Sequence, residues 1–205
     1  MTIADRAEII SKAVEVLNQG GIVLAPTDTV WGLMCDYSSE EAVQSLLSIK
    51  NSPIKPVALL MSSQAMLEQL KVAMPPFVRE ISESLWPGPL TLIFKSGLEN
   101  IGHVAGESNS IGVRVPRGDD LRELIKAFGK PLAASSANIS GQRQPMIFEE
   151  IPDEITMSAD FICKFDIEPS GVSSTVVDCT SEKFIILREG EITLKKLEEA
   201  ASRNG

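Results

Sequence analysis

The stretch GGIVLAPTDTVWGLMCD, residues 20–36, decides how the chain is organised. Residues 22–25 are a short apolar run after a Gly-Gly break, which predicts a buried strand. Pro26 has no backbone N–H to donate to a neighbouring strand, so we expect the strand to end there before a second apolar run begins. Between the two runs stand three small polar residues, Thr27, Asp28 and Thr29. Such groups at a strand end are typical of small-ligand sites in α/β proteins, although an ordinary capped turn is an alternative.

The composition fits a single folded unit. With 205 residues, of which 43% are hydrophobic, the chain can bury one large core or two small ones. The sequence contains no repeat, low-complexity tract or linker. We therefore expect one α/β domain over residues 1–205.

Charge and rare residue types argue against several classes of function. The 28 acidic residues outnumber the 19 basic ones and give a net charge of -9, which disfavours an extended nucleic-acid surface. The chain has a single histidine, which argues against a His-based catalytic triad and against a zinc site. We predict no protein-bound metal.

Localisation is predicted from what the sequence lacks. No apolar run approaches the roughly 20 residues of a membrane span, and the first residues lack the basic flank and apolar block of a signal peptide. The three cysteines are far apart and form no CxxC motif, as expected of reduced thiols in a cytosolic chain. We expect a cytoplasmic protein.

Apolar periodicity and turn residues predict the remaining elements. Strands are expected near residues 57–61, 90–94, 111–115, 132–134, 161–165, 174–178 and 184–187. Helices are expected near residues 3–19, 39–50, 66–70, 76–85, 121–128 and 194–201. The second of these helices is predicted to begin with a capping box formed by Ser38 and Glu41.

Polar or cationic residues follow several of the predicted strands. They are residues 27–29, 50–55, 114–117, 135–138 and 173–175, together with Arg188. Each group alone also fits a turn or a solvated surface. Arg114, however, is the fourth residue of an apolar strand and precedes a proline, so we interpret it as aimed at an anion. Without GxxxxGK[ST] or GxGxxG, the pattern favours an anionic small-molecule site that works by positioning and charge neutralisation.

Six motifs, in their order and spacing, resemble the YrdC family, whose best-known members are threonylcarbamoyl-AMP synthases of the TsaC type. They are APTDTVWGL (25–33), LWPGPLTLIF (85–94), IGVRVP (111–116), SSANISGQ (135–142), SSTVVD (173–178) and ILREGEIT (186–193). The resemblance implies a single α/β domain with a twisted open mixed sheet, flanking helices and a concave ligand cavity.

The resemblance also implies an activity. Members of this type are nucleotidyltransferases that join L-threonine, bicarbonate and ATP into L-threonylcarbamoyl-AMP, with Mg²⁺ accompanying ATP. Threonine's amine captures carbon dioxide as a carbamate, which attacks the α-phosphate and releases pyrophosphate. The product would pass to a tRNA threonylcarbamoyl transferase machinery. The acidic balance of this chain argues against direct tRNA binding.

The resemblance assigns residues to the two substrates. Threonine would be held by Thr27, Arg114, Ser136 and Ser174. ATP would be held by Lys50, Lys55, Ser110, Asn138 and Arg188. Lys50 would also be catalytic by neutralising phosphate charge, and Arg114 suits a bidentate pair with a carboxylate.

The chain departs from the family pattern at five positions. The KxR signature reads Lys50-Asn51-Ser52, and the other departures are Trp31, Ser135, Met146 and Glu189. A serine cannot replace the arginine's charge, so we assign that role to Lys55 on the same loop. The alternative is a catalytically impaired YrdC-like paralogue that binds a nucleotide or RNA. Ser52 favours the alternative, whereas the retained SAN motif and Arg188 favour the enzyme.

Overall fold

A computed structural model describes residues 2–51 and 56–202 of the chain. The strands are β1 (Val23–Pro26), β2 (Trp31–Asp36), β3 (Ala58–Leu60), β4 (Leu90–Lys95), β5 (Ser110–Arg114), β6 (Leu132–Ser136), β7 (Phe161–Ile162), β8 (Thr175–Asp178) and β9 (Ile185–Arg188). The α-helices are α1 (Ile3–Asn18), α2 (Glu40–Ile49), α3 (Pro76–Leu85), α4 (Asp119–Phe128), α5 (Asp153–Ser158) and α6 (Leu194–Ala201). Short 3₁₀ helices are η1 (Gln64–Leu70), η2 (Glu107–Asn109) and η3 (Phe148–Glu150).

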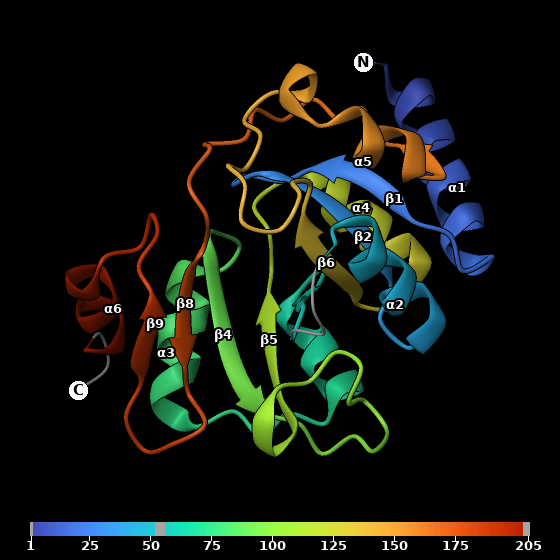
Figure 1. The fold of residues 1–205 in the computed structure, drawn as a ribbon. Coiled ribbons are helices and arrows are strands. Elements are labelled where there is room, and N and C mark those ends of the chain that lie inside the picture. The colour runs from blue at the N-terminus through green and yellow to red at the C-terminus, as the bar shows by residue number, and fades with distance from the viewer. Residues whose placement is uncertain (1, 52–55, 203–205) are drawn as a thin grey trace.

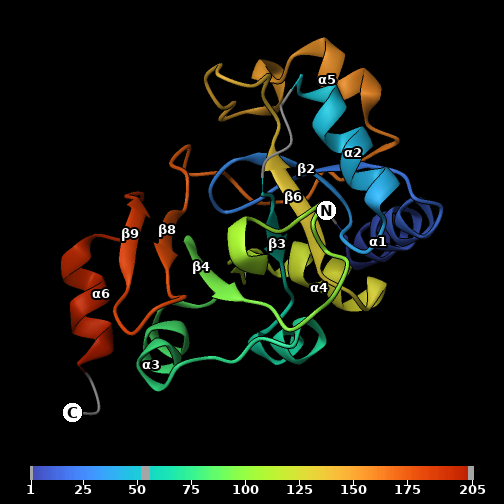
Figure 2. The same cartoon turned by 60° about the horizontal axis from the view of Figure 1, so that its bottom comes forward.

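The strands form one mixed sheet in the order β7-β1-β2-β6-β3-β5-β4-β8-β9. Parallel pairing occurs between β1 and β7, between β3 and β5, and between β4 and β8, and the other pairs are antiparallel. The sheet twists, and helices flank it (Figures 1 and 2). Helix α1 packs against α4, and α3 packs against α6. This confirms the predicted twisted mixed sheet with flanking helices. Within the described residues, no helix combines the length and the apolar character needed to cross a membrane.

Local capping explains where the first helices begin. Thr2 Oγ1 accepts a hydrogen bond from the Asp5 backbone N–H, and the Asp5 carboxylate accepts one from Thr2. This capping box starts α1. The expected cap of α2 is wrong by one residue. Ser39, not Ser38, accepts from the backbone N–H of Ala42, because Ser38 donates from its N–H and its hydroxyl to Asp36.

The strand ends at Pro26, as predicted: Pro26 is the last residue of β1, pairs with Trp31, and is followed directly by a tight turn over residues 27–30. Two other expectations need correction. The strand expected over residues 161–165 is only the two-residue β7, at the edge of the sheet. Helix α5 and η3 occupy a stretch for which the sequence predicted no element, because both are too short to show a helical period.

The two faces of the sheet have different roles. Successive side chains of a strand point to opposite faces, so residues two apart share a face. On one face, Leu33, Leu59, Leu92 and Val113 are completely buried in the hydrophobic core. The alternate residues of the same strands therefore face the other side, where the candidate site lies.

Gly190 fixes the approach of β9 to the start of β8. A Cβ at this position would lie 2.1 Å from the Ser173 carbonyl oxygen and 2.7 Å from the Thr175 backbone nitrogen. We expect Gly190→Ala to destabilise the protein by about 1–3 kcal/mol through overpacking. That change corresponds to a fall in Tm of roughly 2–4 °C per kcal/mol in calorimetry of a chain this size.

Gly102→Ala is the matched control, because a Cβ there meets nothing within 4 Å. It should change the free energy of unfolding by less than about 0.5 kcal/mol. Equal Tm values for the two variants would contradict this account of Gly190.

Candidate functional site

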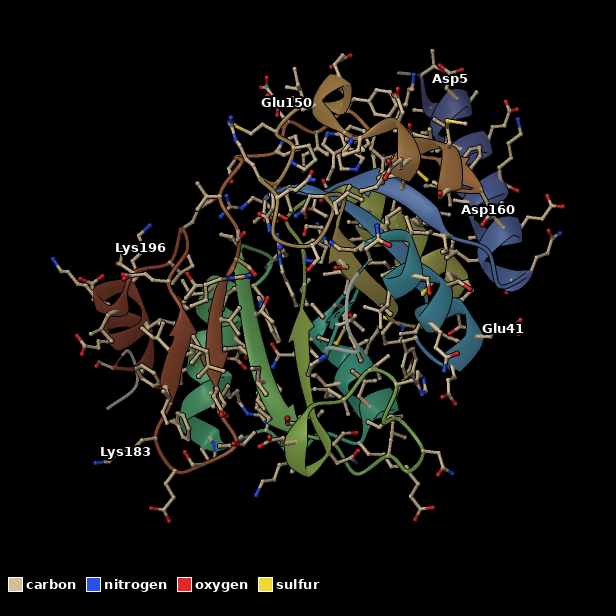
Figure 3. All side chains as sticks on the ribbon, viewed as in Figure 1. Asp5, Glu41, Glu150, Asp160, Lys183 and Lys196 are labelled. Atoms are coloured by element: carbon tan, nitrogen blue, oxygen red, sulfur yellow. The ribbon has the colours of Figure 1, made fainter. Side chains whose placement is uncertain are left out.

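A cavity of about 310 Å³ lies over the face of the sheet that the core leaves uncovered. Its lining comes from β2, β3, β4, β5, β6, β8, β9 and the segments that adjoin them. The polar residues that line it are Thr27, Thr29, Thr91, Arg114, Ser135, Ser136, Gln144, Ser173, Ser174 and Arg188. Charged residues such as Glu41, Lys183 and Lys196 instead lie at the periphery of the molecule (Figure 3).

Small residues in register form the floor of this cavity. Ala134 on β6 pairs with Met34 on β2 and with Ala58 on β3, and Ala58 pairs with Gly112 on β5. All four line the cavity. A Cβ on Gly112 would lie 3.3 Å from the methyl group of Thr91. Because three of the four are Ala or Gly, the space above the sheet is left for a ligand.

Arg114 is a buried cation in the lining of this cavity, and it is only 5% exposed. Its Nε donates to the Gly88 carbonyl at 3.1 Å, its Nη1 to Thr29 Oγ1 at 2.8 Å, and its Nη2 to Asp28 Oδ1. Burial lowers the pKa of Arg114, and the negative charge of Asp28 opposes that shift. A guanidinium stays protonated in proteins, so the site holds a fixed positive charge.

The hydroxyls of Thr27 and Thr29 form a chain with a defined direction. Thr27 Oγ1 donates to the Val30 carbonyl at 2.7 Å, which uses its only proton. In the 2.9 Å contact between the two hydroxyls, Thr29 must therefore be the donor. Both protons are directed into the turn, and Arg114 donates to Thr29 from the other side. A ligand would meet Thr29 as an acceptor, while Thr27 is committed to shaping the turn.

A second pair of hydroxyls lies between β4 and β8. Thr91 Oγ1 and Ser174 Oγ are 2.8 Å apart, and Arg188 Nη2 donates to Ser174 Oγ at 3.1 Å. Whichever of the two hydroxyls donates to the other, one proton of the pair stays available for a ligand. Burial lowers the pKa of Arg188, which also donates from Nε to the Ser174 carbonyl at 3.0 Å.

Lys50 adjoins the cavity through Ser136. Its Nζ donates to the carbonyl oxygen of Ser136, to Ser136 Oγ at 3.2 Å and to Asn138 Oδ1 at 3.5 Å. Burial lowers the pKa of Lys50 to about 8. The side-chain N–H₂ of Asn138 donates to the carbonyls of Ile139 and Gln142, which holds the SAN loop in shape.

The structure brings most of the predicted site residues together. Thr27, Arg114, Ser136, Ser174 and Arg188 line the cavity, and Lys50 and Asn138 stand directly behind Ser136. Ser110 lies at the opposite end of β5 from Arg114, next to Gly106 and Pro56 at the edge of the cavity. Lys55 and Ser52 lie outside the described residues.

Sequence reasoning missed two polar lining residues. Thr91 is the one polar residue in the apolar run LTLIF, and that interruption was an available signal. Gln144 accepts a hydrogen bond from Ser173 Oγ at 2.6 Å, both residues line the cavity, and nothing in the local sequence of Gln144 indicates this.

The donor set of the cavity favours binding over acid–base catalysis. Within the described residues, neither a carboxylate nor a histidine lines the cavity, and no cluster of three or more His, Cys, Asp or Glu residues could hold a metal ion. Its ionisable lining groups are the guanidinium groups of Arg114 and Arg188. Two cations, several hydroxyls and an apolar floor suit an anionic ligand with both polar and apolar parts.

Comparisons with known proteins agree with this picture. The Sua5/YciO/YrdC family model, described as "Telomere recombination", matches residues 15–190. A threonylcarbamoyl-AMP synthase from Pyrococcus abyssi (strain GE5 / Orsay) is 30% identical over 184 residues, which cover 89% of this chain and 54% of that protein. This chain therefore spans about half the length of the curated relative it matches.

Two solved structures resemble the fold. P. abyssi Sua5 complexed with L-threonine has a TM-score of 0.85 and 29% identity, covering 95% of this chain and 57% of that one. Escherichia coli YciO has a TM-score of 0.81 and 24% identity over 93% of each chain, a likeness that shows the fold.

The lowered pKa of Lys50 predicts how stability depends on pH. An unfolded lysine titrates near 10.5 and the folded Lys50 near 8, so between these values the unfolded chain binds more protons. Stability contributed by Lys50 therefore rises with pH in this window. We expect urea unfolding at pH 7, 8, 9 and 10 to show the natural chain gaining stability relative to Lys50→Met above pH 8.

Lys195→Met provides the control, because the side chain of Lys195 is 84% exposed. Its stability difference from the natural chain should not change in the same window. A constant difference for Lys50→Met across all four pH values would show that Lys50 has an ordinary pKa.

Proposed function

The chain belongs to the Sua5/YciO/YrdC family, and we propose that it synthesises L-threonylcarbamoyl-AMP from L-threonine, bicarbonate and ATP. The observation that carries the proposal is the cavity in which buried Arg114 and the more exposed Arg188 face one apolar floor. Arg114 suits the carboxylate of an amino acid, and Arg188 suits a phosphate. The P. abyssi relative is a threonylcarbamoyl-AMP synthase, and a solved Sua5 structure contains L-threonine.

Threonine would lie at the Arg114 end of the cavity. Three of the five N–H groups of a guanidinium are used by Gly88, Thr29 and Asp28, which leaves one on each terminal nitrogen for a carboxylate. Thr29 can accept from the amine or the hydroxyl of the substrate. Thr27 would act by shaping the turn, and Ser136 and Ser174 would supply further hydroxyls.

ATP would lie between Arg188 and the Lys50–Ser136–Asn138 group. Lys50 lies directly behind Ser136, which lines the cavity. We propose that Lys50 is catalytic by neutralising charge on the phosphates during displacement. Asn138 would fix Lys50 and Ser136 relative to each other. We also propose that Ser110 and Lys55 contribute to the ATP site.

The proposed chemistry needs positioning more than proton transfer. The carbamate of threonine attacks the α-phosphate, pyrophosphate leaves, and the developing charge is met by fixed cations. Mg²⁺ would enter on the phosphates of ATP and keep most of its water ligands, since no carboxylate of the described residues lines the cavity. We further propose that a tRNA threonylcarbamoyl transferase machinery takes up the product in the cytoplasm.

Product analysis tests the reaction. We expect the chain, supplied with ATP, Mg²⁺ and bicarbonate, to release pyrophosphate and form a threonine-containing adenylate only when L-threonine is present. Labelled-threonine chromatography with a pyrophosphate assay measures both products. ATP binding without any such adenylate would reject the proposed reaction and favour the catalytically impaired, nucleotide-binding paralogue.

Two substitutions test the division of the cavity. Arg114→Ala should weaken L-threonine binding by roughly 1.5–3 kcal/mol, or about ten- to a hundredfold, because one charge-assisted contact is lost. Arg188→Ala should weaken ATP binding to a similar degree. Calorimetric titration of each ligand measures both effects, with thermal unfolding as the check on folding. If Arg114→Ala weakens ATP and leaves threonine unchanged, the two ends are assigned the wrong way round.

A further inference from the structure

Asp28 stands behind the wall of the cavity and not in it. Its side chain is 7% exposed, and the residue is not part of the lining. Oδ1 accepts from Nη2 of Arg114, whereas Oδ2 is fully buried and has no hydrogen-bond partner within the described part of the chain. A buried polar atom without a partner is unfavourable, so its presence needs a reason beyond packing.

The hydrogen bonds of Arg114 suggest that reason. Nε and Nη1 are bound by neutral acceptors, the Gly88 carbonyl and Thr29 Oγ1. Asp28 is the charged anchor, and it binds Nη2. All three hydrogen bonds have the ionised guanidinium as donor, and the Asp28 contact is the one that holds Nη2, so Asp28 fixes that end of the guanidinium plane. The two unused N–H groups are on Nη1 and Nη2, where they can bind both oxygens of one carboxylate.

We propose that Asp28 is a positioning residue for amino-acid binding: it acts through Arg114 and holds the guanidinium with its two unused N–H groups toward the cavity. The inference rests on the proposed function, because it takes the carboxylate of L-threonine as the group that these N–H groups bind. Asp28 itself does not touch the substrate.

Positioning and charge predict opposite effects when Asp28 is removed. Loss of a carboxylate beside the guanidinium makes the site more positive, which by charge alone strengthens the attraction for an anion. Loss of the hydrogen bond from Nη2 to Asp28 lets the guanidinium plane rotate. Binding a carboxylate through both N–H groups then becomes weaker, because the orientation of the plane must be restored on binding.

Glu191 offers a matched charge control. Its carboxylate also acts electrostatically on Arg114, but it accepts its hydrogen bond from the hydroxyl of Ser170. Glu191→Gln therefore removes one negative charge near Arg114 and keeps an acceptor for Ser170. Asp28→Asn removes the other charge and keeps an amide oxygen that can accept from Nη2.

The test is calorimetric titration of L-threonine, and separately of Mg²⁺-ATP, into the natural chain, Asp28→Ala, Asp28→Asn and Glu191→Gln. We expect Asp28→Ala to weaken threonine binding at least tenfold. Asp28→Asn and Glu191→Gln should stay within threefold of the natural chain, and ATP affinity should stay within threefold in every variant. Circular dichroism and thermal unfolding establish that each variant is folded.

Threonine binding by Asp28→Ala that is as tight as in the natural chain, or tighter, would overturn the proposal. An equal loss of threonine affinity in Asp28→Asn and Asp28→Ala would also overturn it. That result would mean that binding requires the negative charge of Asp28 and not its hydrogen bond with Nη2. Should Asp28→Ala fail to fold, preserved affinity in Asp28→Asn supports the proposal, and a tenfold loss or a gain overturns it. Failure of the natural chain to bind threonine would reject the proposed function itself, and this inference with it.

Discussion

Arg114 is a buried cation, and much of the surrounding structure serves to keep it there. Moving a guanidinium out of water costs several kcal/mol unless an opposite charge and hydrogen-bond acceptors replace the solvent. The turn after β1 supplies Asp28 and Thr29, and the connector before β4 supplies the Gly88 carbonyl. Segments far apart in the sequence thus meet at one side chain. These acceptors offset the cost of burying the charge. They also give the guanidinium a fixed direction as a binding group.

Arg114 lies on the face of the sheet that carries the cavity, and the opposite face packs against the core. In β5, Ile111 and Val113 are completely buried, while Gly112 and Arg114 face the cavity. The same alternation in the neighbouring strands puts Leu33, Leu59 and Leu92 on the core face. The cavity face carries the small residues Gly32, Ala58 and Thr91 together with the larger Met34, Leu60 and Ile93. Stability and binding therefore depend on different residues of the same strands. A one-residue change of register would exchange the two faces.

The sequence predicts the elements of this fold better than it predicts their geometry. Apolar runs locate the central strands, and the position of Arg114 in an apolar strand before a proline correctly marks it as unusual. The resemblance then places Ser136, Ser174 and Arg188 beside it, and the structure gathers all of them at one cavity. The cap of α2 was misplaced because competition between Ser38 and Ser39 is decided by Asp36, at the end of another element.

Some features depend on strand pairing and have no local signal. The floor of small residues exists only because Ala134, Ala58 and Gly112 fall into register on three strands that are distant in the sequence. The role of Asp28 is equally hidden, because the motif shows a carboxylate in a turn but not the arginine that it binds 86 residues away. Long-range contacts of this kind follow from topology, which residue patterns do not specify.

The account's central claim is that Arg114, held from behind, presents two N–H groups to the carboxylate of an amino acid. A crystal structure of the chain with bound L-threonine tests this most directly. The account predicts both carboxylate oxygens at about 2.7–2.9 Å from Nη1 and Nη2 of Arg114, the range of charge-assisted hydrogen bonds, with the Asp28 contact intact. A threonine carboxylate bound elsewhere in the cavity, or an Arg114 that has left Asp28 to reach it, would contradict the account.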